Sequence, residues 1–174
     1  MEPSNVYKYC PRCGSKFNRV NDDLLKCPNC DLNFYINALP CNSSIVVNQS
    51  GEILLGERTM EPYKGFLDTP GGFLSLRESM EACMVREIEE ECGIKAKEGE
   101  LKYFKNYPTR YMYNDMNLHL VLFCYILKVS DNIKIKDTKE LIKVKFYNKE
   151  TIPYEKVGFE VVKRSIRDYL SNQT

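Results

Sequence analysis

Residues 69–94 read TPGGFLSLRESMEACMVREIEEECGI, a glycine pair followed by a long stretch with helical periodicity. Ser75 and Glu78 have the spacing of a capping box, and Gly93 suits the position just after a helix C-terminus. The sequence therefore predicts a helix from about residue 76 to about residue 92.

Three glutamates of this predicted helix share one face. At 100° per residue, Glu90 and Glu91 fall within about 60° of Glu87. Like charges this close repel one another, and a hard cation such as Mg2+ or Mn2+ would relieve the repulsion. Arg86 lies one turn before Glu90 and is placed to restrain part of the cluster. Glu-rich helices are also typical of solvated surfaces, so the helix alone leaves both interpretations open.

The residues around the helix are more specific. They run Gly72, five residues, Glu78, seven residues, Arg86-Glu87-Ile88, one residue, Glu90-Glu91, one residue and Gly93-Ile94. This spacing resembles the signature of the Nudix hydrolases at every fixed position, and the resemblance covers roughly residues 40–170. It implies an α/β fold, an α/β/α sandwich with a mixed sheet, and hydrolysis of a diphosphate bond with the help of divalent cations.

The resemblance also implies roles for individual residues. Glu87, Glu90 and Glu91 would be catalytic carboxylates that bind Mg2+ or Mn2+, with Arg86 beside them. Gly71 would bring its backbone close to the metal, and Gly72 would do the same for the substrate. A further carboxylate is expected from a downstream loop: Glu140 is the first candidate, and its rivals are Asp137 and Glu150. Carboxylate-bound Mg2+ neutralises phosphate oxygens and activates water, as this reaction requires.

The N-terminal part of the chain carries two cysteine pairs. Cys10 and Cys13 are two residues apart, as are Cys27 and Cys30. Two such knuckles complete a tetrahedral sulfur shell that suits Zn2+, and disulfides or free thiols are the alternatives. The pattern resembles a zinc ribbon over residues 1–38. Such a segment is too short to bury a sufficient core, so zinc is expected to be structural and to supply folding free energy.

The rest of the chain alternates strands and helices. Apolar or β-branched runs predict strands at 44–48, 53–58, 103–107, 118–129 and 143–147, and helical spacing predicts a helix over 159–170. Together with the glutamate helix they predict one layered domain over residues 39–174. The remaining cysteines lie in apolar stretches and are expected to be small buried side chains: Cys41, Cys83, Cys92 and Cys124.

Composition excludes some functions. The chain has 25 Lys and Arg against 24 Asp and Glu, a net charge of +1, so it lacks the basic field of a dedicated duplex-DNA binder. No apolar run is long enough to cross a bilayer, and the N-terminus lacks the pattern of a signal peptide. We therefore expect a folded protein in the cytoplasm or another reducing compartment, without a membrane partner.

The order of the two modules bears on the substrate. A zinc ribbon before a Nudix domain resembles the NADH pyrophosphatases, including relatives that remove an NAD cap from RNA. Their Ser-Gln-Pro-Trp-Pro-Phe-Pro array is absent, because residues 106–111 read NYPTRY and the chain has no Trp. Pro108 is instead similar to a feature of ADP-ribose pyrophosphatases. The expected substrate is a nucleoside diphosphate linked to another moiety, such as ADP-ribose or NAD(H). Capped RNA is a further candidate, and homodimers are common in the family.

Several side chains are candidates for substrate binding. A base would stack on Phe66 or Tyr111, with Tyr113 and Phe159 as further candidates, and Arg58 or Arg110 would meet a phosphate. The resemblance implies that one of the three glutamates or a later acidic residue is the general base. His119, the only histidine, lies within a strand-like run and is a less favoured candidate.

Two other functions stay open at this point. One is a noncatalytic nucleotide sensor or nucleic-acid-binding regulator on a Nudix fold, and the other is a housecleaning nucleoside-triphosphate pyrophosphatase. The intact glutamate set favours catalysis over the regulator.

Overall fold

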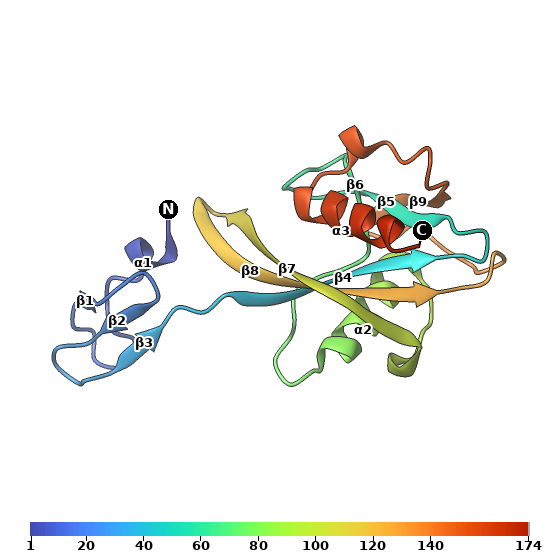
Figure 1. The fold of residues 1–174 in the computed structure, drawn as a ribbon. Coiled ribbons are helices and arrows are strands. Elements are labelled where there is room, and N and C mark those ends of the chain that lie inside the picture. Colours follow the sequence, from blue (N-terminus) through green and yellow to red (C-terminus); the bar gives the residue numbers. More distant parts are fainter. Residues whose placement is uncertain (174) are drawn as a thin grey trace. The chain divides into compact units, whose positions relative to one another are not determined.

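The computed structural model describes residues 1–173 (Figure 1). The chain divides into two compact units. The first unit comprises Met1–Leu39 and Pro108–Val121, and the second comprises Pro40–Tyr107 and the chain from Leu122 onward. The division into domains at residues 1–38 and 39–174 stays a prediction about which segments fold on their own.

The first unit is built around a small antiparallel sheet. It contains the short helix α1 (Pro3–Val6) and the strands β1 (Asn18–Arg19), β2 (Leu24–Lys26) and β3 (Asn33–Tyr35), in the order β1-β2-β3. Its core consists of a few buried side chains: Cys10, Phe17, Leu25 and Cys27. So small a core is insufficient to hold a fold without a further crosslink.

The second unit holds most of a six-stranded sheet. The strands of this sheet are β4 (Leu39–Val47), β5 (Ile53–Arg58), β6 (Leu67–Asp68), β7 (Leu101–Tyr113), β8 (Met116–Lys128) and β9 (Leu141–Tyr147). Residues 108–113 of β7 and 116–121 of β8 belong to the first unit. The order is β6-β5-β4-β8-β7, and β9 pairs antiparallel with β5. Two short 3-10 turns, Glu98–Glu100 and Tyr154–Lys156, lie outside the sheet.

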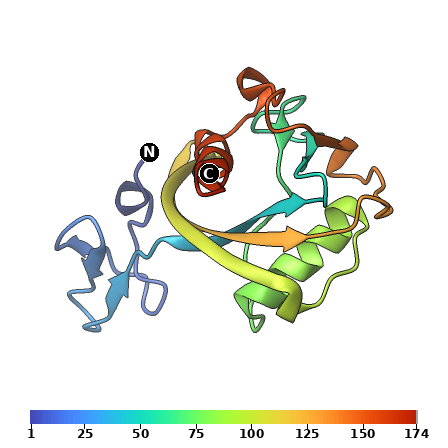
Figure 2. The same cartoon turned by 45° about the vertical axis from the view of Figure 1, so that its right-hand side comes forward.

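Two helices cover opposite faces of this sheet (Figures 1 and 2). Helix α2 (Met80–Cys92) packs Met84 and Ile88 into a core with Val46 and Leu54 of the sheet. Helix α3 (Glu160–Ser171) buries its apolar stripe against the other face. The predicted α/β/α sandwich is confirmed.

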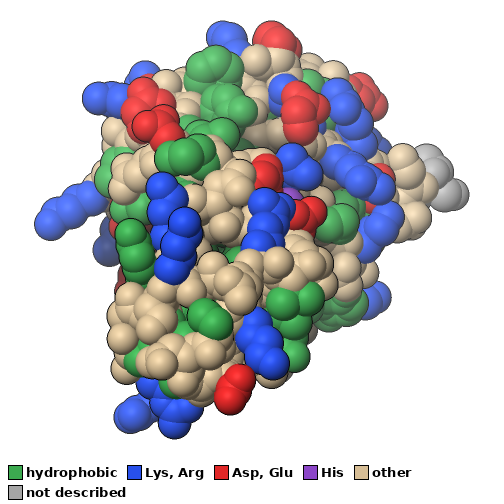
Figure 3. All heavy atoms as spheres, turned by 90° about the vertical axis from the view of Figure 1, so that its left-hand side faces the viewer, with side chains coloured by type: hydrophobic (Ala, Val, Ile, Leu, Met, Phe, Trp, Pro, Cys, Tyr) green, Lys and Arg blue, Asp and Glu red, His purple; other side chains and the backbone are tan. Residues whose placement is uncertain are grey.

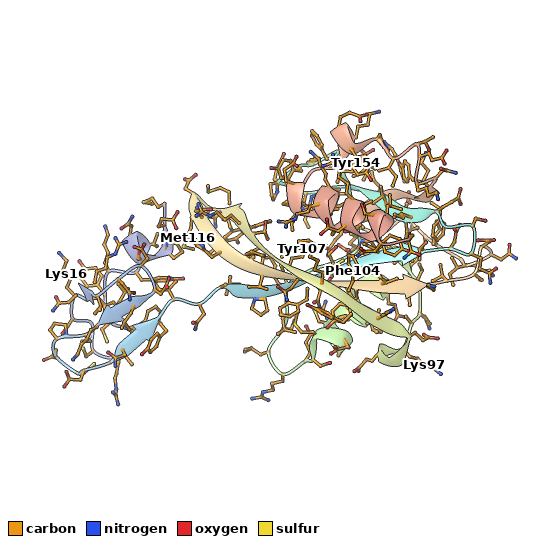
Figure 4. The ribbon with its side chains drawn as sticks, in the orientation of Figure 1. Lys16, Lys97, Phe104, Tyr107, Met116 and Tyr154 are labelled. Atoms are coloured by element: carbon orange, nitrogen blue, oxygen red, sulfur yellow. The ribbon has the colours of Figure 1, made fainter. Side chains whose placement is uncertain are left out.

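Side chains of strand β7 and helix α3 join the sheet to the helix that covers this face. The Phe104 and Tyr169 ring centroids lie 6.1 Å apart, and the Tyr107 hydroxyl donates a hydrogen bond to Asp168 at 3.0 Å. Phe104 and Tyr107 are labelled on β7 in Figure 4. The hydrogen-bond partner satisfies the polar end of Tyr107, whose side chain is otherwise fully buried. The face of the sheet that α3 covers is therefore closed by both apolar and polar contacts.

The predicted helix ends are right at the C-terminus and wrong at the N-terminus. Gly93 follows α2 with φ 72°, as expected of a left-handed cap. The helix begins at Met80 rather than near residue 76, because Arg77 has φ 73° and interrupts a helical backbone. Ser79 is the N-cap, and its hydroxyl accepts a hydrogen bond from Ala82 N at 3.0 Å. The Glu78 carboxylate still accepts one from Ser75 N, at 2.6 Å.

Other predictions from composition can also be compared with the structure. Cys41, Cys83, Cys92 and Cys124 are buried, as expected. Each helix in the described part of the chain is too short or too polar to cross a membrane. Figure 3 shows Lys and Arg side chains in small groups with other side chains between them.

Candidate active site

The glycine pair lies in a loop that is held on strand β4 by main-chain hydrogen bonds. Asn42 N donates to Gly72 O at 2.8 Å, and Ser44 N donates to Pro70 O at 2.8 Å. The hydroxyls of Ser43 and Thr69 are 2.7 Å apart and share a buried hydrogen bond. The loop between β6 and α2 is therefore held against β4 by main-chain hydrogen bonds, as a neighbouring strand would be.

Both glycines are needed because other atoms approach them closely. A Cβ on Gly71 would lie 2.2 Å from the carbonyl oxygen of Asn42, and one on Gly72 would lie 2.3 Å from Glu87 Oε1. Gly71 N also donates a hydrogen bond to Glu91 Oε2 at 2.8 Å. The two residues thus bring main chain directly against two carboxylates of α2.

Arg86 ties three carboxylates of this region together. Its Nη1 donates to Glu87 Oε1 at 2.7 Å and to Glu90 Oε2 at 3.0 Å. Its Nη2 and Nε donate to the two oxygens of Glu78, at 2.9 and 3.2 Å. These hydrogen bonds lower the pKa of Glu78 to about 2 and raise the pKa of Arg86. The contact with Glu90 is the restraint expected from the helical spacing.

Glu87 and Glu91 are the buried members of the cluster. Only 7% of Glu91 is exposed, and burial raises its pKa to about 9 against the opposing hydrogen bond from Gly71. Burial also raises the pKa of Glu87, although Arg86 opposes the shift. Burying a carboxylate without a full set of partners costs free energy. A cation bound here would favour the charged forms and recover that cost.

Asp68 is part of the same cluster, and the sequence analysis did not identify it. It is buried at the end of β6, its pKa is raised to about 6 by burial, and its charge helps to raise the pKa of Glu91. Arg58 Nη1 donates to Asp68 at 2.7 Å, so the guanidinium is engaged with a carboxylate. The available signal was an acidic residue after Phe66-Leu67, directly before the glycine loop.

Glu140 reaches the cluster from the loop before β9. Its charge raises the pKa of both Glu87 and Glu91. Thr59 N donates to the carbonyl oxygen of Glu140 at 3.0 Å. In the same loop, the hydroxyl of Thr138 donates to the carbonyl oxygen of Glu91 at 3.2 Å. These bonds fix the loop against the end of α2.

The two rivals of Glu140 are engaged elsewhere. The carboxylate of Asp137 accepts a hydrogen bond from Val144 N at 3.0 Å, and main-chain bonds from Lys143 and Val144 lower its pKa. Glu150 lies in a turn in which its N–H donates to the side chain of Asn148 at 2.9 Å. Of the three candidates, Glu140 is the one whose charge raises the pKa of Glu87 and Glu91.

The other predicted substrate-binding residues fall into two groups. Phe66 and Phe159 lie in the second unit, where both contact the ring of Tyr63. Tyr111 belongs to the first unit, together with Arg110, Tyr113 and His119. His119 Nε2 lies 2.7 Å from Glu2 Oε2 in that unit. The roles of Tyr111 and His119 toward a substrate stay predictions.

Four sulfur atoms meet in the first unit. The ligand atoms of Cys10, Cys13, Cys27 and Cys30 all lie within 4.8 Å of one another. Two of the sulfur pairs are 3.6 and 3.4 Å apart, close to the separation of about 3.8 Å in a tetrahedral site with Zn–S bonds near 2.3 Å. Hydrogen bonds with Ser15 lower the pKa of Cys13, which favours the thiolate that a metal binds. The set fits Zn2+.

The raised pKa of Glu91 predicts a pH-dependent stability. A carboxyl whose pKa rises from 4.5 to about 9 on folding destabilises the fold progressively as the pH rises through that interval. Gln at position 91 has no charge and keeps an oxygen facing Gly71 N. With divalent metal removed by EDTA, the Glu91→Gln variant should therefore melt about 3 °C or more above the parent protein at pH 9. Near pH 5 the variant and the parent protein should melt at the same temperature. Equal melting temperatures at pH 9 would contradict this account.

Comparisons with known proteins agree with this arrangement. The family model described as NUDIX domain matches residues 42–168. The chain is similar to two proteins named NAD-capped RNA hydrolase NudC. The one from Shigella dysenteriae serotype 1 (strain Sd197) is 28% identical over 163 residues, which are 93% of this chain and 60% of that protein. The one from Haemophilus influenzae (strain PittGG) is 34% identical over 115 residues, which are 64% of this chain and 42% of that protein.

The chain thus spans 60% or less of the length of these two relatives. Among solved structures, a NUDIX hydrolase from Nitrosomonas europaea superposes with a TM-score of 0.68 at 22% identity, over 94% of this chain and 90% of that chain. That likeness concerns the fold. Because the family model covers most of the sequence and includes the glycine loop and helix α2, this chain belongs to the Nudix family.

Proposed function

We propose that this protein is a Mg2+- or Mn2+-dependent pyrophosphohydrolase. Its substrate would be a nucleoside diphosphate linked to another moiety, of the ADP-ribose or NAD(H) type. The observation that carries the proposal is that Glu87 and Glu91 of α2 lie against the main chain of Gly71 and Gly72, with the charges of Asp68 and Glu140 acting on Glu91. The names of the two NudC relatives support the substrate class and add capped RNA as a candidate.

The donor set fits a hard divalent cation, because it consists of carboxylate oxygens, two of them buried. Glu87, Glu90 and Glu91 are the proposed ligands. Bound Mg2+ would neutralise the diphosphate oxygens and lower the pKa of the attacking water. Arg86 keeps the carboxylates of Glu87 and Glu90 converged through its Nη1.

We assign the role of general base to Glu140. Its side chain is exposed on a loop fixed by Thr59, so it can accept a proton from water and release it to solvent. The assignment is supported by the action of its charge on Glu87 and Glu91, two of the proposed ligands. A general base must come within hydrogen-bond reach of the proton it accepts, directly or through one water.

The four cysteines are proposed to bind a structural Zn2+. All four tetrahedral positions would be filled by protein ligands, which leaves no place for a substrate. We propose that the protein works in a reducing compartment such as the cytoplasm, where the cysteines of such a site remain thiolates rather than forming disulfides. A homodimer stays a prediction from the family resemblance.

A screen of substrates tests the proposal. The protein is incubated with Mg2+ or Mn2+ and ADP-ribose, NADH, NAD, NAD-capped RNA, diadenosine polyphosphates or nucleoside triphosphates, and the products are identified. We expect cleavage of the ADP-ribose or NAD class to two monophosphates. Release of pyrophosphate from triphosphates alone would indicate the housecleaning activity instead. Binding without cleavage of any compound would indicate a regulator.

Gly72→Ala should reduce turnover without unfolding the protein. The added methyl group would overlap the carboxylate of Glu87, which is the mobile end of a side chain and can move away. A displacement of about 1 Å at a catalytic group costs about 100-fold in rate. Gly71→Ala is the structural comparison, because its methyl group would overlap the main chain of Asn42, and this variant should melt at a lower temperature. Parent-like kcat in Gly72→Ala would contradict the assigned role of Glu87.

A further inference from the structure

In the second unit, two aromatic rings of the turn between β5 and β6, Tyr63 and Phe66, meet a third ring, Phe159, from a distant segment. The Tyr63 ring centroid lies 5.9 Å from that of Phe66 and 4.9 Å from that of Phe159, both with edge-to-face geometry. Tyr63 and Phe66 remain 43% and 40% exposed. We call these three residues the aromatic platform.

The platform is held by a constrained turn between β5 and β6. Tyr63 has φ 64°, a left-handed conformation that is uncommon for a bulky residue. Gly158 makes room for it, because a Cβ there would lie 2.7 Å from Tyr63 Cβ. Phe66 N donates to Tyr63 O at 3.0 Å and closes the turn. Backbone strain of this kind persists where the surrounding structure imposes it, and it is often found at ligand sites.

Arg58 connects the platform to the carboxylate cluster. Its guanidinium lies 5.0 Å from the centroid of the Phe159 ring, and its Nε donates to Pro62 O at 2.9 Å. The same guanidinium donates from Nη1 to Asp68, whose charge acts on Glu91. Arg58 therefore contacts both the aromatic platform and Asp68 of the carboxylate cluster.

We infer that the aromatic platform is the subsite for the nucleobase of the substrate. This inference rests on the proposed function and specifies its substrate class as adenine nucleotides. The base stacks on the exposed faces of Tyr63 and Phe66, while the diphosphate lies at the glycine loop. A purine covers more of the two rings than a pyrimidine does, so adenine-containing diphosphates are preferred over uracil-containing ones. Arg58 serves to fix Phe159 and the turn rather than to bind a phosphate.

A fluorescence titration tests this subsite without requiring catalysis. The chain has no Trp, so Tyr63→Trp introduces a single indole into the platform. We expect AMP to quench its fluorescence and ribose 5-phosphate, which has the phosphate but no base, to leave it unchanged. Tyr103→Trp is the matched control: Tyr103 is 48% exposed and packs against Tyr125 at 5.9 Å, outside the platform. AMP should not quench this variant.

A kinetic measurement gives an independent second test. Phe66→Leu keeps an apolar side chain but removes a ring, and loss of a stacked base costs about 10-fold or more in affinity. The KM for ADP-ribose should rise by about that factor, with a smaller change in kcat. UDP-ribose should be affected less, because its base stacks more weakly.

The two tests separate this subsite from the proposed activity. If AMP quenches Tyr63→Trp but no compound is cleaved, the subsite stands and the proposed hydrolysis fails. If ADP-ribose is cleaved while AMP leaves the Tyr63→Trp fluorescence unchanged and Phe66→Leu keeps the parent KM, the subsite is overturned and the proposed hydrolysis stands. A melting curve for each variant verifies that it is folded.

Discussion

Glu90→Gln is expected to lower kcat by about 1000-fold while the protein melts at an almost unchanged temperature. Glu90 is the exposed member of the α2 cluster, with 56% of its side chain accessible, so the fold does not depend on its burial. Gln preserves the shape and can still accept the hydrogen bond from Arg86 Nη1. It removes the negative charge that the proposed Mg2+ ligand contributes. The measurement is steady-state hydrolysis of the preferred compound over a series of Mg2+ concentrations.

Glu89→Gln provides the matched control for this experiment. Glu89 is the preceding residue of the same helix, and its side chain is 50% exposed. Its Oε1 lies 3.9 Å from Lys95 Nζ, and it does not belong to the cluster held by Arg86. The two substitutions remove the same charge from neighbouring positions. We expect Glu89→Gln to keep the parent rate. Equal rates for the two variants would remove Glu90 from the metal site.

Cys27→Ser is expected to abolish zinc binding and to unfold the ribbon. Cys27 is fully buried in the small core of the first unit, beside Leu25 and Phe17. Structural zinc sites contribute about 10–16 kcal/mol to the folding of such segments, far more than this core can supply. Zinc analysis of the purified protein and limited proteolysis measure the two effects. Cleavage should appear within residues 1–38 in the variant and be absent from the parent protein.

The same variant separates the two proposed metal sites. Every residue that we place at the carboxylate cluster belongs to the second unit, from Asp68 to Glu140. Mg2+-dependent hydrolysis should therefore persist in Cys27→Ser. Cys124→Ser is the control: this buried thiol lies in the second unit, so the variant should keep its zinc. Zinc retained by Cys27→Ser would overturn the assignment of the ribbon site.

Local chemistry made much of this protein predictable from its sequence. The left-handed conformation at Gly93 and the angular proximity of Glu87, Glu90 and Glu91 depend on residues within a few turns of one helix. The convergence of the cysteines followed from the two-residue spacing of each pair. The start of α2 was predicted wrongly, because Ser75-x-x-Glu78 has the spacing of a capping box even where Arg77 prevents a helix.

The rest of the candidate site was decided by tertiary structure. The sequence ranked Glu140 ahead of Asp137, but the physical difference between them is tertiary: the carboxylate of Asp137 accepts a hydrogen bond from the main chain of β9. Nothing marked Asp68 as buried beside Glu91, or Tyr63 as a partner of Phe159, since these contacts join distant segments.

The sequence thus determined which chemical groups are present. The spacing of the residues determined how these groups lie within one helix or one cysteine pair, because local backbone geometry fixes those relations. Only the folded sheet decided which of the remaining charges and rings reach the same place. Burial then sets the pKa of Glu91 and Asp68, because desolvation depends on everything that packs around a group and not on its neighbours in the chain.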